Sequence, residues 1–308
     1  MCPPNAPCES CQREGALFRP KMGQPNSPTS QHAATLLQHE TQRAARLIER
    51  HHPPWRVEYH ATLDSTQSEA LRRITSQNPP KHPFLLVAEH QQEGQGRHGR
   101  QWNAPPGTAL LFTAATPLSR AGRGAADPHN GNYPLSLWPL QIGMALFVRL
   151  WSFGWHAALK WPNDVLVERH KAAGILCQVR SGWLLAGIGV NLLQREQDFA
   201  AVSDARVPPG SLAMFSREGC PAPEQMAPTL LQSAVSILEA PWETGRMMFF
   251  YRKWCTTIGE TFRLEDGRHA VAKDIDPDGR LIVETNQGEI EHLSGELPAA
   301  KGAANEHA

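Results

Sequence analysis

The apolar positions of the chain recur with two different spacings, which predict a region of mixed helices and strands followed by a small all-β unit. Apolar residues three and four positions apart predict amphipathic helices, and short apolar or alternating runs between turn residues predict strands. The expected helices lie at 31–50, after Ser65 through Ile74, at 137–150 and twice within 223–254. The expected strands lie at 55–59, 84–88, 108–114, 171–176 and 183–193, with two more on either side of a Pro-Asn-Asp turn within 158–167.

From Gly259 onward the pattern changes to short alternating runs at 261–264, 269–275, 281–285 and 288–293. Asp-Gly, Pro-Asp-Gly and Asn-Gln-Gly turns separate these runs. The pattern therefore predicts a small antiparallel barrel or sheet.

Three segments lack a pattern that would pack. Residues 1–29 are rich in proline and poor in apolar side chains, so we expect a disordered leader. Residues 119–133 are rich in Gly, Asp, Asn and Arg and predict a long mobile insertion, and the last dozen residues form a polar tail. Because a single helix is ended by Pro53 and Pro54, residues 1–54 are too short for a three-helix DNA-binding domain.

Composition narrows the class of function. Thirty Lys and Arg residues balance thirty Asp and Glu residues, so overall charge predicts neither sequence-specific DNA binding nor attraction to an anionic membrane. No apolar stretch is long enough to span a bilayer, and the N-terminus has no secretory signal. Six scattered cysteines predict a reduced, cytoplasmic protein, and the CxxC pair Cys8 and Cys11 is interpreted as coincidence because no second pair follows.

Residues 89–102 carry the strongest chemical signal. The apolar run 84–88 predicts a strand that leads into this segment, where Gly94, Gly96 and Gly99 allow tight turns with exposed backbone N–H groups. The segment also contains Arg97, Arg100 and Trp102. Guanidinium groups bind phosphate or carboxylate, and an indole ring stacks on flat rings, so we expect an anion, such as a nucleotide, to bind here. A basic surface loop without a ligand is the alternative.

A second polar position is expected at the start of the helix that ends at Ile74. Asp64 or Ser65 would cap this helix, and Ser65 and Thr66 would present hydroxyl groups at its N-terminus. Such a terminus suits a small polar ligand, although capping alone would also explain these residues.

Two further motifs lie in the following strands. The Pro-Asn-Asp turn brings together a cation, an amide and a carboxylate, those of Lys160, Asn163 and Asp164. Lys171 begins the next strand, where a solvated lysine is the ordinary alternative. Gly187 and Gly189 lie within a buried strand, which indicates that a ligand or a backbone segment lies against it.

Together these motifs resemble those of biotin protein ligases. QQEGQGRHGRQW at 91–102 resembles the biotin-loop signature of that family, usually written GRGRRGRxW. KWPND at 160–164 with GIL at 174–176 resembles the second signature, and GIGVNL at 187–192 resembles the third. The motifs occur in the family's order, and the resemblance covers about residues 55–295.

The resemblance implies an α+β fold. It consists of a class II synthetase-like, mixed-sheet catalytic domain of the biotin/lipoate ligase type and a small SH3-like β-barrel. On this basis the chain divides into a disordered leader with one helix at 1–54, the catalytic domain at 55–257, the SH3-like domain at 258–297 and a disordered tail at 298–308.

The resemblance also implies a two-step reaction. Biotin and MgATP first give biotinyl-5′-AMP and pyrophosphate, and one lysine of a biotin carboxyl carrier protein then attacks the mixed anhydride. Arg97 and Lys171 are the implied catalytic cations beside the carboxylate and the α-phosphate, and Mg²⁺ would neutralise the phosphates without a dedicated protein metal site.

The implied binding residues form two sets. Biotin would be bound by Ser65, Thr66, Gln67, Gln91, Gln92, Gly94, Gly96, Arg97, His98, Lys171 and Gly174, with backbone N–H groups serving at Gly94 and Gly96. ATP would be bound by Arg97, Arg100, Trp102, Lys160, Asn163 and Asn191, with the Trp102 ring stacked on adenine. Gln95 and His98 stand where the family has loop arginines, and Gln67 stands where it usually has asparagine.

Three alternatives are less well supported. A lipoate or octanoate protein ligase would have a similar fold, but the KWPND and loop signatures favour biotin. A biotin-responsive repressor would need an N-terminal DNA-binding domain, which residues 1–54 are not expected to form. A nucleotide-binding module without catalysis would lack Arg97 or Lys171, and both are present.

Overall fold

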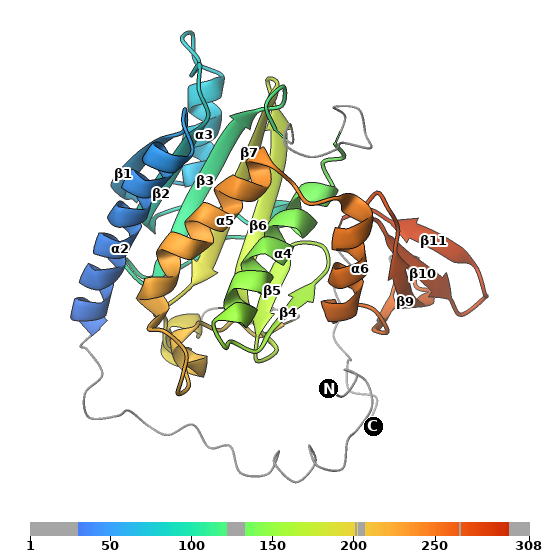
Figure 1. Cartoon of the computed structure of the whole chain (residues 1–308). Helices are drawn as coiled ribbons and strands as arrows, with labels where there is room; N and C mark the ends of the chain where they lie inside the picture. Colours follow the sequence, from blue (N-terminus) through green and yellow to red (C-terminus); the bar gives the residue numbers. More distant parts are fainter. Residues whose placement is uncertain (1–29, 122–132, 201, 203–206, 265, 296–308) are drawn as a thin grey trace.

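The computed structural model describes residues 30–121, 133–200, 202, 207–264 and 266–295. These residues form a seven-stranded mixed sheet flanked by helices, with a four-stranded antiparallel sheet beside it (Figure 1). The predicted leader at 1–29, most of the predicted insertion at 119–133 and the predicted tail at 298–308 lie outside the described residues.

The large sheet has the strand order β1-β2-β3-β7-β6-β5-β4. Its strands are β1 (Arg56–Leu63), β2 (Phe84–Gln91), β3 (Ala109–Pro117), β4 (Ala157–Lys160), β5 (Asp164–Val167), β6 (His170–Arg180) and β7 (Trp183–Asn191). β1 and β2 are parallel, and all other neighbours are antiparallel. β3 is buried along almost its whole length because both faces of the sheet are covered.

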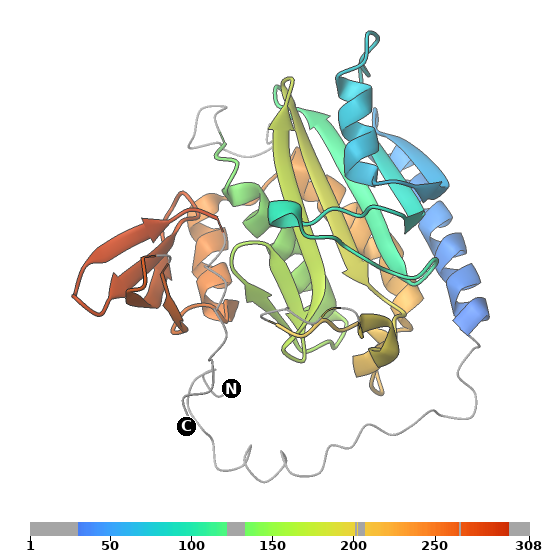
Figure 2. The same ribbon diagram turned by 180° about the vertical axis from the view of Figure 1, so that it is seen from behind.

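Different helices cover the two faces of the large sheet. α2 (Ser30–His51), α4 (Leu137–Ser152) and α5 (Ala227–Glu239) lie on the face toward the viewer in Figure 1, and α3 (Thr66–Ile74) lies on the opposite face, seen in Figure 2. The main core lies under the three helices and includes the fully buried Trp55, Phe112 and Trp138. Short 3-10 turns occur at Arg97–Gly99, Glu196–Phe199, Ala213–Phe215 and Pro223–Met226.

α6 (Thr244–Trp254) leads from α5 into the small sheet, whose strand order is β11-β10-β9-β8. Its strands are β8 (Thr261–Arg263), β9 (His269–Ile275), β10 (Leu281–Thr285) and β11 (Ile290–Leu293). The antiparallel unit predicted from the alternating runs is confirmed, and β8 and β11 form the edges of the described sheet.

The small sheet is fastened to the large one by specific hydrogen bonds. The Thr256 N–H donates to the Leu159 carbonyl at 2.8 Å, and Ser136 Oγ donates to the Asp278 carbonyl at 2.5 Å. Both bonds join the segment around the small sheet to elements of the large domain, which fixes the two units against each other.

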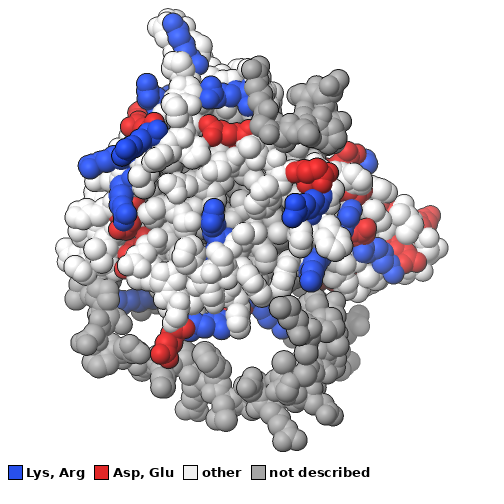
Figure 3. Space-filling model, in the orientation of Figure 1, with Lys and Arg blue, Asp and Glu red and all other residues white. Residues whose placement is uncertain are grey.

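The predicted helices and strands and the α+β fold class are confirmed, with element ends shifted by a few residues. On the face shown in Figure 3, Lys and Arg side chains are interspersed with Asp and Glu side chains and do not form one field of a single sign. Among the described residues, no helix combines the length and the apolar character needed to cross a membrane.

Asp276, at the turn between β9 and β10, provides a test of the small sheet. Its carboxylate accepts from the N–H groups of Asp278 and Arg280 and pairs with the side chains of Arg280 and His292 at 2.7 and 2.8 Å. Burial alone would raise the pKa of Asp276, but the hydrogen bonds from His292 and Arg280 outweigh burial and hold this pKa below its ordinary value.

We expect Asp276→Asn to lower the free energy of unfolding by about 1–3 kcal/mol near neutral pH, because the N–H donors around this position lose a buried, charged acceptor. A lowered folded-state pKa stabilises above the ordinary carboxyl pKa, and this contribution is lost as pH falls through the folded value. The difference between the two proteins should therefore shrink below about pH 4. Denaturant unfolding of both proteins between about pH 7 and pH 3 measures this difference in unfolding free energy. A difference that does not change with pH would contradict a lowered pKa for Asp276.

Candidate functional site

A cavity of about 400 Å³ lies on the face of the large sheet that carries α3. Figure 2 shows this face, with α3 and the connection from β2 to β3 crossing in front of the sheet. The walls come from the start of α3, the glycine-rich loop after β2 (residues 92–102, the glycine loop), the β4–β5 turn, β6 and β7, together with Phe199, Val202, Val207 and Pro209.

The start of α3 is fixed by a chain of buried hydrogen bonds. Ser65 Oγ accepts from the N–H groups of Gln67 and Ser68 and so caps the helix. Gln91 Oε1 accepts from both the N–H and the hydroxyl of Thr66, at 2.7 and 2.9 Å, and the Thr113 hydroxyl lies 2.9 Å from Thr66 Oγ1. These hydrogen bonds hold Ser65 and Thr66 in fixed positions at the cavity wall.

Gln67 presents an unsatisfied donor at the same position. Its side chain is 4% exposed, and its Oε1 accepts from the Thr113 hydroxyl at 3.2 Å. Its buried Nε2 has no hydrogen-bond partner among the described residues. Because an unpaired buried donor is costly, this amide fits a ligand that carries an acceptor.

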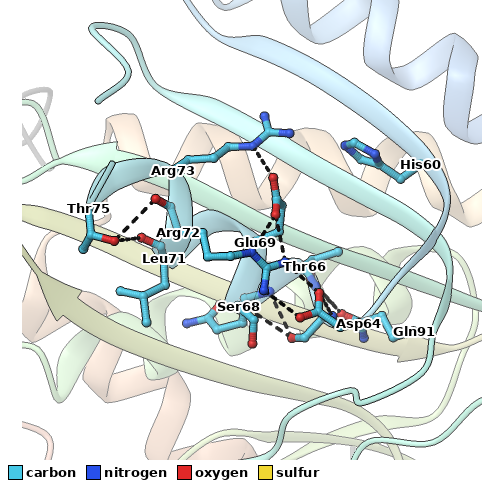
Figure 4. A network of polar contacts seen from close by, with 12 residues as sticks. His60, Asp64, Thr66, Ser68, Glu69, Leu71, Arg72, Arg73, Thr75 and Gln91 are labelled. Carbon is cyan, nitrogen blue, oxygen red and sulfur yellow. Dashed lines mark hydrogen bonds and ion pairs between the residues drawn. The ribbon is translucent and has the colours of Figure 1, made fainter. Parts of the chain in front are cut away.

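Asp64 has a different role from Ser65, because its carboxylate pairs with Arg72 (Figure 4). Arg72 binds its two oxygens with two N–H groups at 2.7 and 2.8 Å, and also pairs with Glu69. The hydrogen bonds from Arg72 lower the pKa of Asp64 to about 2. Of the two predicted caps, Ser65 is therefore the one that caps α3, while Asp64 ties the preceding turn to the helix.

The glycine loop folds back on itself as a narrow hairpin. The Trp102 N–H donates to the Gly94 carbonyl at 2.8 Å, and the Gly96 N–H donates to the Arg100 carbonyl at 2.7 Å. A Cβ atom at Gly94 would lie 2.2 Å from the Trp102 carbonyl oxygen, so only glycine permits this approach. His98, at the tip, has an exposed side chain and a positive φ of 54°.

Trp102 leaves the hairpin and lies flat against the sheet. Cβ atoms at Gly189 and Gly174 would lie 2.5 and 2.8 Å from its ring. Lys171 Nζ stands 5.7 Å from the ring centroid, and the buried Nε1 has no hydrogen-bond partner among the described residues. The ring thus forms one wall of the cavity beside a lysine.

Three cations along the wall are each held by a different partner. Lys171 Nζ lies 2.7 Å from Asp164 Oδ1, and Lys160 Nζ lies 3.1 Å from Glu260 Oε2. Arg97 Nη1 donates to Asn163 Oδ1 at 3.3 Å. Three cationic groups therefore gather around the β4–β5 turn, where they could bind an anionic ligand.

Asn191 supports the wall by binding backbone. Its Nδ2 donates to the Gly210 carbonyl at 3.1 Å, and its Oδ1 accepts from Gln194. It holds the segment that follows residue 206 beside β6, where Lys171 N–H also donates to the Pro208 carbonyl.

The cavity brings together most of the residues expected from the sequence: Ser65, Thr66, Gln67, Gln91, Gly96, Arg97, Arg100, Trp102, Lys160, Asn163, Lys171, Gly174 and Asn191. Gln92, Gly94 and His98 are not part of its described lining. Gly187 and Gly189 do lie under close neighbours as expected, but these are the side chains of Gln67 and Trp102.

Other lining residues were not expected: Gln95, Gln101, Asn103, Trp161, Asp164, Ile175, Leu176, Ile188, Phe199, Val202, Val207 and Pro209. Asp164 was noted in the turn motif with Lys160 and Asn163, but it was not assigned to either binding set. Phe199, Val202, Val207 and Pro209 belong to no motif, so nothing in the sequence indicated that they line the cavity.

Comparison with known proteins identifies the class. Residues 59–194 match the Biotin/lipoate A/B protein ligase family, and residues 257–295 match the Biotin protein ligase C terminal domain. The two matches together span more than half of the chain. The chain belongs to the biotin/lipoate protein ligase family and, within it, has the catalytic and C-terminal domains of biotin protein ligases.

Relatives that match most of the chain agree with this. A biotin–[acetyl-CoA-carboxylase] ligase of Mycobacterium tuberculosis is 28% identical over 78% of this chain and 90% of its own length. The enzyme of the same name from Paracoccus denitrificans is 28% identical over 72% of this chain and 92% of its own length. The structure of a biotin protein ligase from Aquifex aeolicus in complex with biotin and ATP shares the fold, with a TM-score of 0.56, 21% identity and coverage of 79% of this chain and 96% of that one.

The contact of Trp102 with Gly189 can be tested without a ligand. Gly189→Ala should destabilise the fold by about 1–3 kcal/mol, because the added methyl group overlaps the ring and overpacks the site. The double variant Gly189→Ala with Trp102→Ala has no such overlap. Its loss of unfolding free energy should therefore be smaller than the sum of the losses in the two single variants. Denaturant unfolding measures all three.

Gly143→Ala is the matched control. Gly143 lies inside α4, and a Cβ there would have ordinary contacts, the nearest at 3.7 Å from Ile175. We expect it to be neutral or slightly stabilising. A Gly189→Ala variant as stable as this control would show that Trp102 does not lie on β7.

Proposed function

We propose that this chain attaches biotin to a lysine of a biotin carboxyl carrier protein, with ATP and through a biotinyl-5′-AMP intermediate. The observation that carries the proposal is the polarity of one cavity. Its α3 end offers a fixed, neutral set of donors and acceptors, and its far end offers cations and a flat indole. A ligand with a polar neutral head and a carboxylate that must meet a nucleotide phosphate matches both ends.

The head group favours biotin over lipoate. Gln67 Nε2 is a buried donor that needs an acceptor. A ureido carbonyl accepts such a bond strongly, whereas a dithiolane sulfur is a weak acceptor. Lipoate would leave the donor unpaired, at a cost of about 1–3 kcal/mol.

The cations serve the first step. The carboxylate and the α-phosphate repel each other, so their approach requires positive charge placed beforehand. Lys171, held at 2.7 Å by Asp164 and lying over the Trp102 ring, would stand beside the reacting carboxylate. Arg97, oriented by Asn163, would hold the phosphate from the loop side. Trp102 would stack on adenine, and the closed loop would keep water from the anhydride.

Mg²⁺ fits this lining as an ion that is bound mainly by the triphosphate. Nucleotide sites usually hold Mg²⁺ with one or two carboxylates and the phosphates themselves. Asp164 is the one carboxylate among the described lining residues, so it is the residue that would face such an ion. The ion would neutralise phosphate charge.

The second step needs an outside amine. The carrier lysine would enter at the open side of the cavity and attack the acyl carbon, releasing AMP. We place the reaction in the cytoplasm, supported by the free thiols of Cys177, Cys220 and Cys255.

The direct test incubates the protein with ATP, Mg²⁺, biotin and a carrier domain and measures the mass of the carrier. We expect one biotin per carrier, dependent on ATP, and no modification when lipoate replaces biotin. A carrier whose accepting lysine is replaced by arginine is the control. Transfer of lipoate at a rate equal to that of biotin would contradict the biotin assignment.

Lys171→Ala should slow formation of the adenylate by about 2.7–4 kcal/mol in activation free energy, as is typical when a positioned charge is removed. Pyrophosphate release in the absence of carrier measures this step. Lys253→Ala, which removes an exposed lysine of α6 outside the cavity lining, is the control and should leave the rate unchanged.

Arg97→Gly should act differently, because Arg97 lies on the loop at the cavity wall and would enclose the finished adenylate. We expect biotinyl-AMP to escape and to label exposed lysines of a bystander protein such as serum albumin. Bystander labelling and pyrophosphate release are measured side by side with Lys171→Ala. If Lys171→Ala is the variant that leaks, the two roles are assigned wrongly.

A further inference from the structure

Lys160 places a buried ammonium group in the cavity wall. The residue is 7% exposed, and its Nζ lies 3.3 and 3.1 Å from the two carboxylate oxygens of Glu260. A buried charge is tolerated only when it is paired. Glu260 therefore allows this cation to stand at the wall.

Glu260 reaches Lys160, a residue of the cavity wall, from the C-terminal unit. It directly precedes β8, and its backbone is bound on both sides. Its N–H donates to the Thr257 carbonyl at 3.0 Å, and its own carbonyl accepts from the N–H of Ala272 in β9 at 3.0 Å. The carboxylate is thus carried by a rigid part of the small sheet, one hundred residues along the chain from Lys160.

The residue after Lys160 is held by the same unit. The Trp161 N–H donates to Thr257 Oγ1 at 3.0 Å, and the Trp161 indole donates to the Gly279 carbonyl at 2.9 Å, both in buried positions. The same turn carries Asn163 and Asp164, which hold the other two cations of the wall. A shift of the small sheet would therefore also move the β4–β5 turn.

We propose that Glu260 is a positioning residue of the nucleotide site. Through Lys160 it fixes where positive charge meets the triphosphate. A lysine has a flexible four-carbon stem with about 2 kcal/mol of rotamer entropy. Pairing with Glu260 removes that freedom before the nucleotide binds, which is preorganisation of the site by the C-terminal unit. This inference rests on the proposed function, since it assumes that ATP binds at the Lys160 end of the cavity.

The test is Glu260→Gln, which keeps the size and one acceptor oxygen but removes the charge that holds Lys160. We expect ATP to bind about tenfold more weakly by calorimetry, equivalent to about 1.4 kcal/mol. The KM for ATP should rise accordingly, with the KM for biotin unchanged. Glu260→Asp keeps the charge, and the lysine stem can follow it, so its ATP affinity should lie closer to that of the unaltered protein.

Ser136→Ala is the matched control, because it removes another bond to the small sheet at Asp278, away from the cavity lining. It should leave ATP affinity unchanged. Equal ATP affinity in Glu260→Gln and the unaltered protein would overturn this inference but not the proposed function. Weakening of ATP and biotin alike, or the same loss in Ser136→Ala, would show general loosening and would also overturn it. If the unaltered protein binds no ATP, the proposed function fails and this inference fails with it.

Discussion

The cavity depends on the absence of side chains from one patch of the large sheet. Alternate residues of a strand face the same side, so Gly187 and Gly189 of β7 share the face that carries α3, while Ile188 faces the core. A Cβ at Gly187 would meet Gln67 Oε1 at 2.6 Å, and one at Gly189 would meet the Trp102 ring at 2.5 Å. The polar end and the aromatic wall can therefore both rest on bare backbone. The two ends of the cavity are held at a fixed separation because one rigid strand supports both.

The electrostatics of the wall follow from how its cations are held. Charges of one sign placed together repel strongly in a poorly solvated cavity unless each has a local partner. Lys171 has a carboxylate from the next strand, Lys160 has one from the small sheet, and Arg97 has a neutral amide. The partners fix the direction of each cation while leaving one face of the group toward the cavity.

Local features could be predicted from the sequence because they depend on residues close together in the chain. Periodicity located the strands, and the polar start of α3 was found as a cap, although choosing Ser65 over Asp64 needed the contact with Arg72. Features formed between distant segments could not be predicted. Neither charge periodicity nor a motif connects Lys160 with Glu260, since the two meet only when the small sheet packs on the β4–β5 turn. The domain boundary predicted at 257 and 258 consequently falls inside the set of contacts that builds the site.

The hairpin form of the glycine loop limits how it can recognise a ligand. The N–H groups of Gly96 and Trp102, two of the donors that a glycine-rich loop could offer to an anion, are already bonded to carbonyls within the hairpin. In this geometry the loop therefore meets a ligand through the side chains of Arg97, Arg100 and Trp102. For the Gly96 N–H to bind a ligand, its bond to Arg100 would have to break, which would loosen the hairpin that places Trp102 on β6 and β7. Recognition by the loop backbone is thus coupled to packing of the Trp102 indole on Gly174 and Gly189. A ligand that binds the Gly96 N–H must therefore itself hold the indole in place.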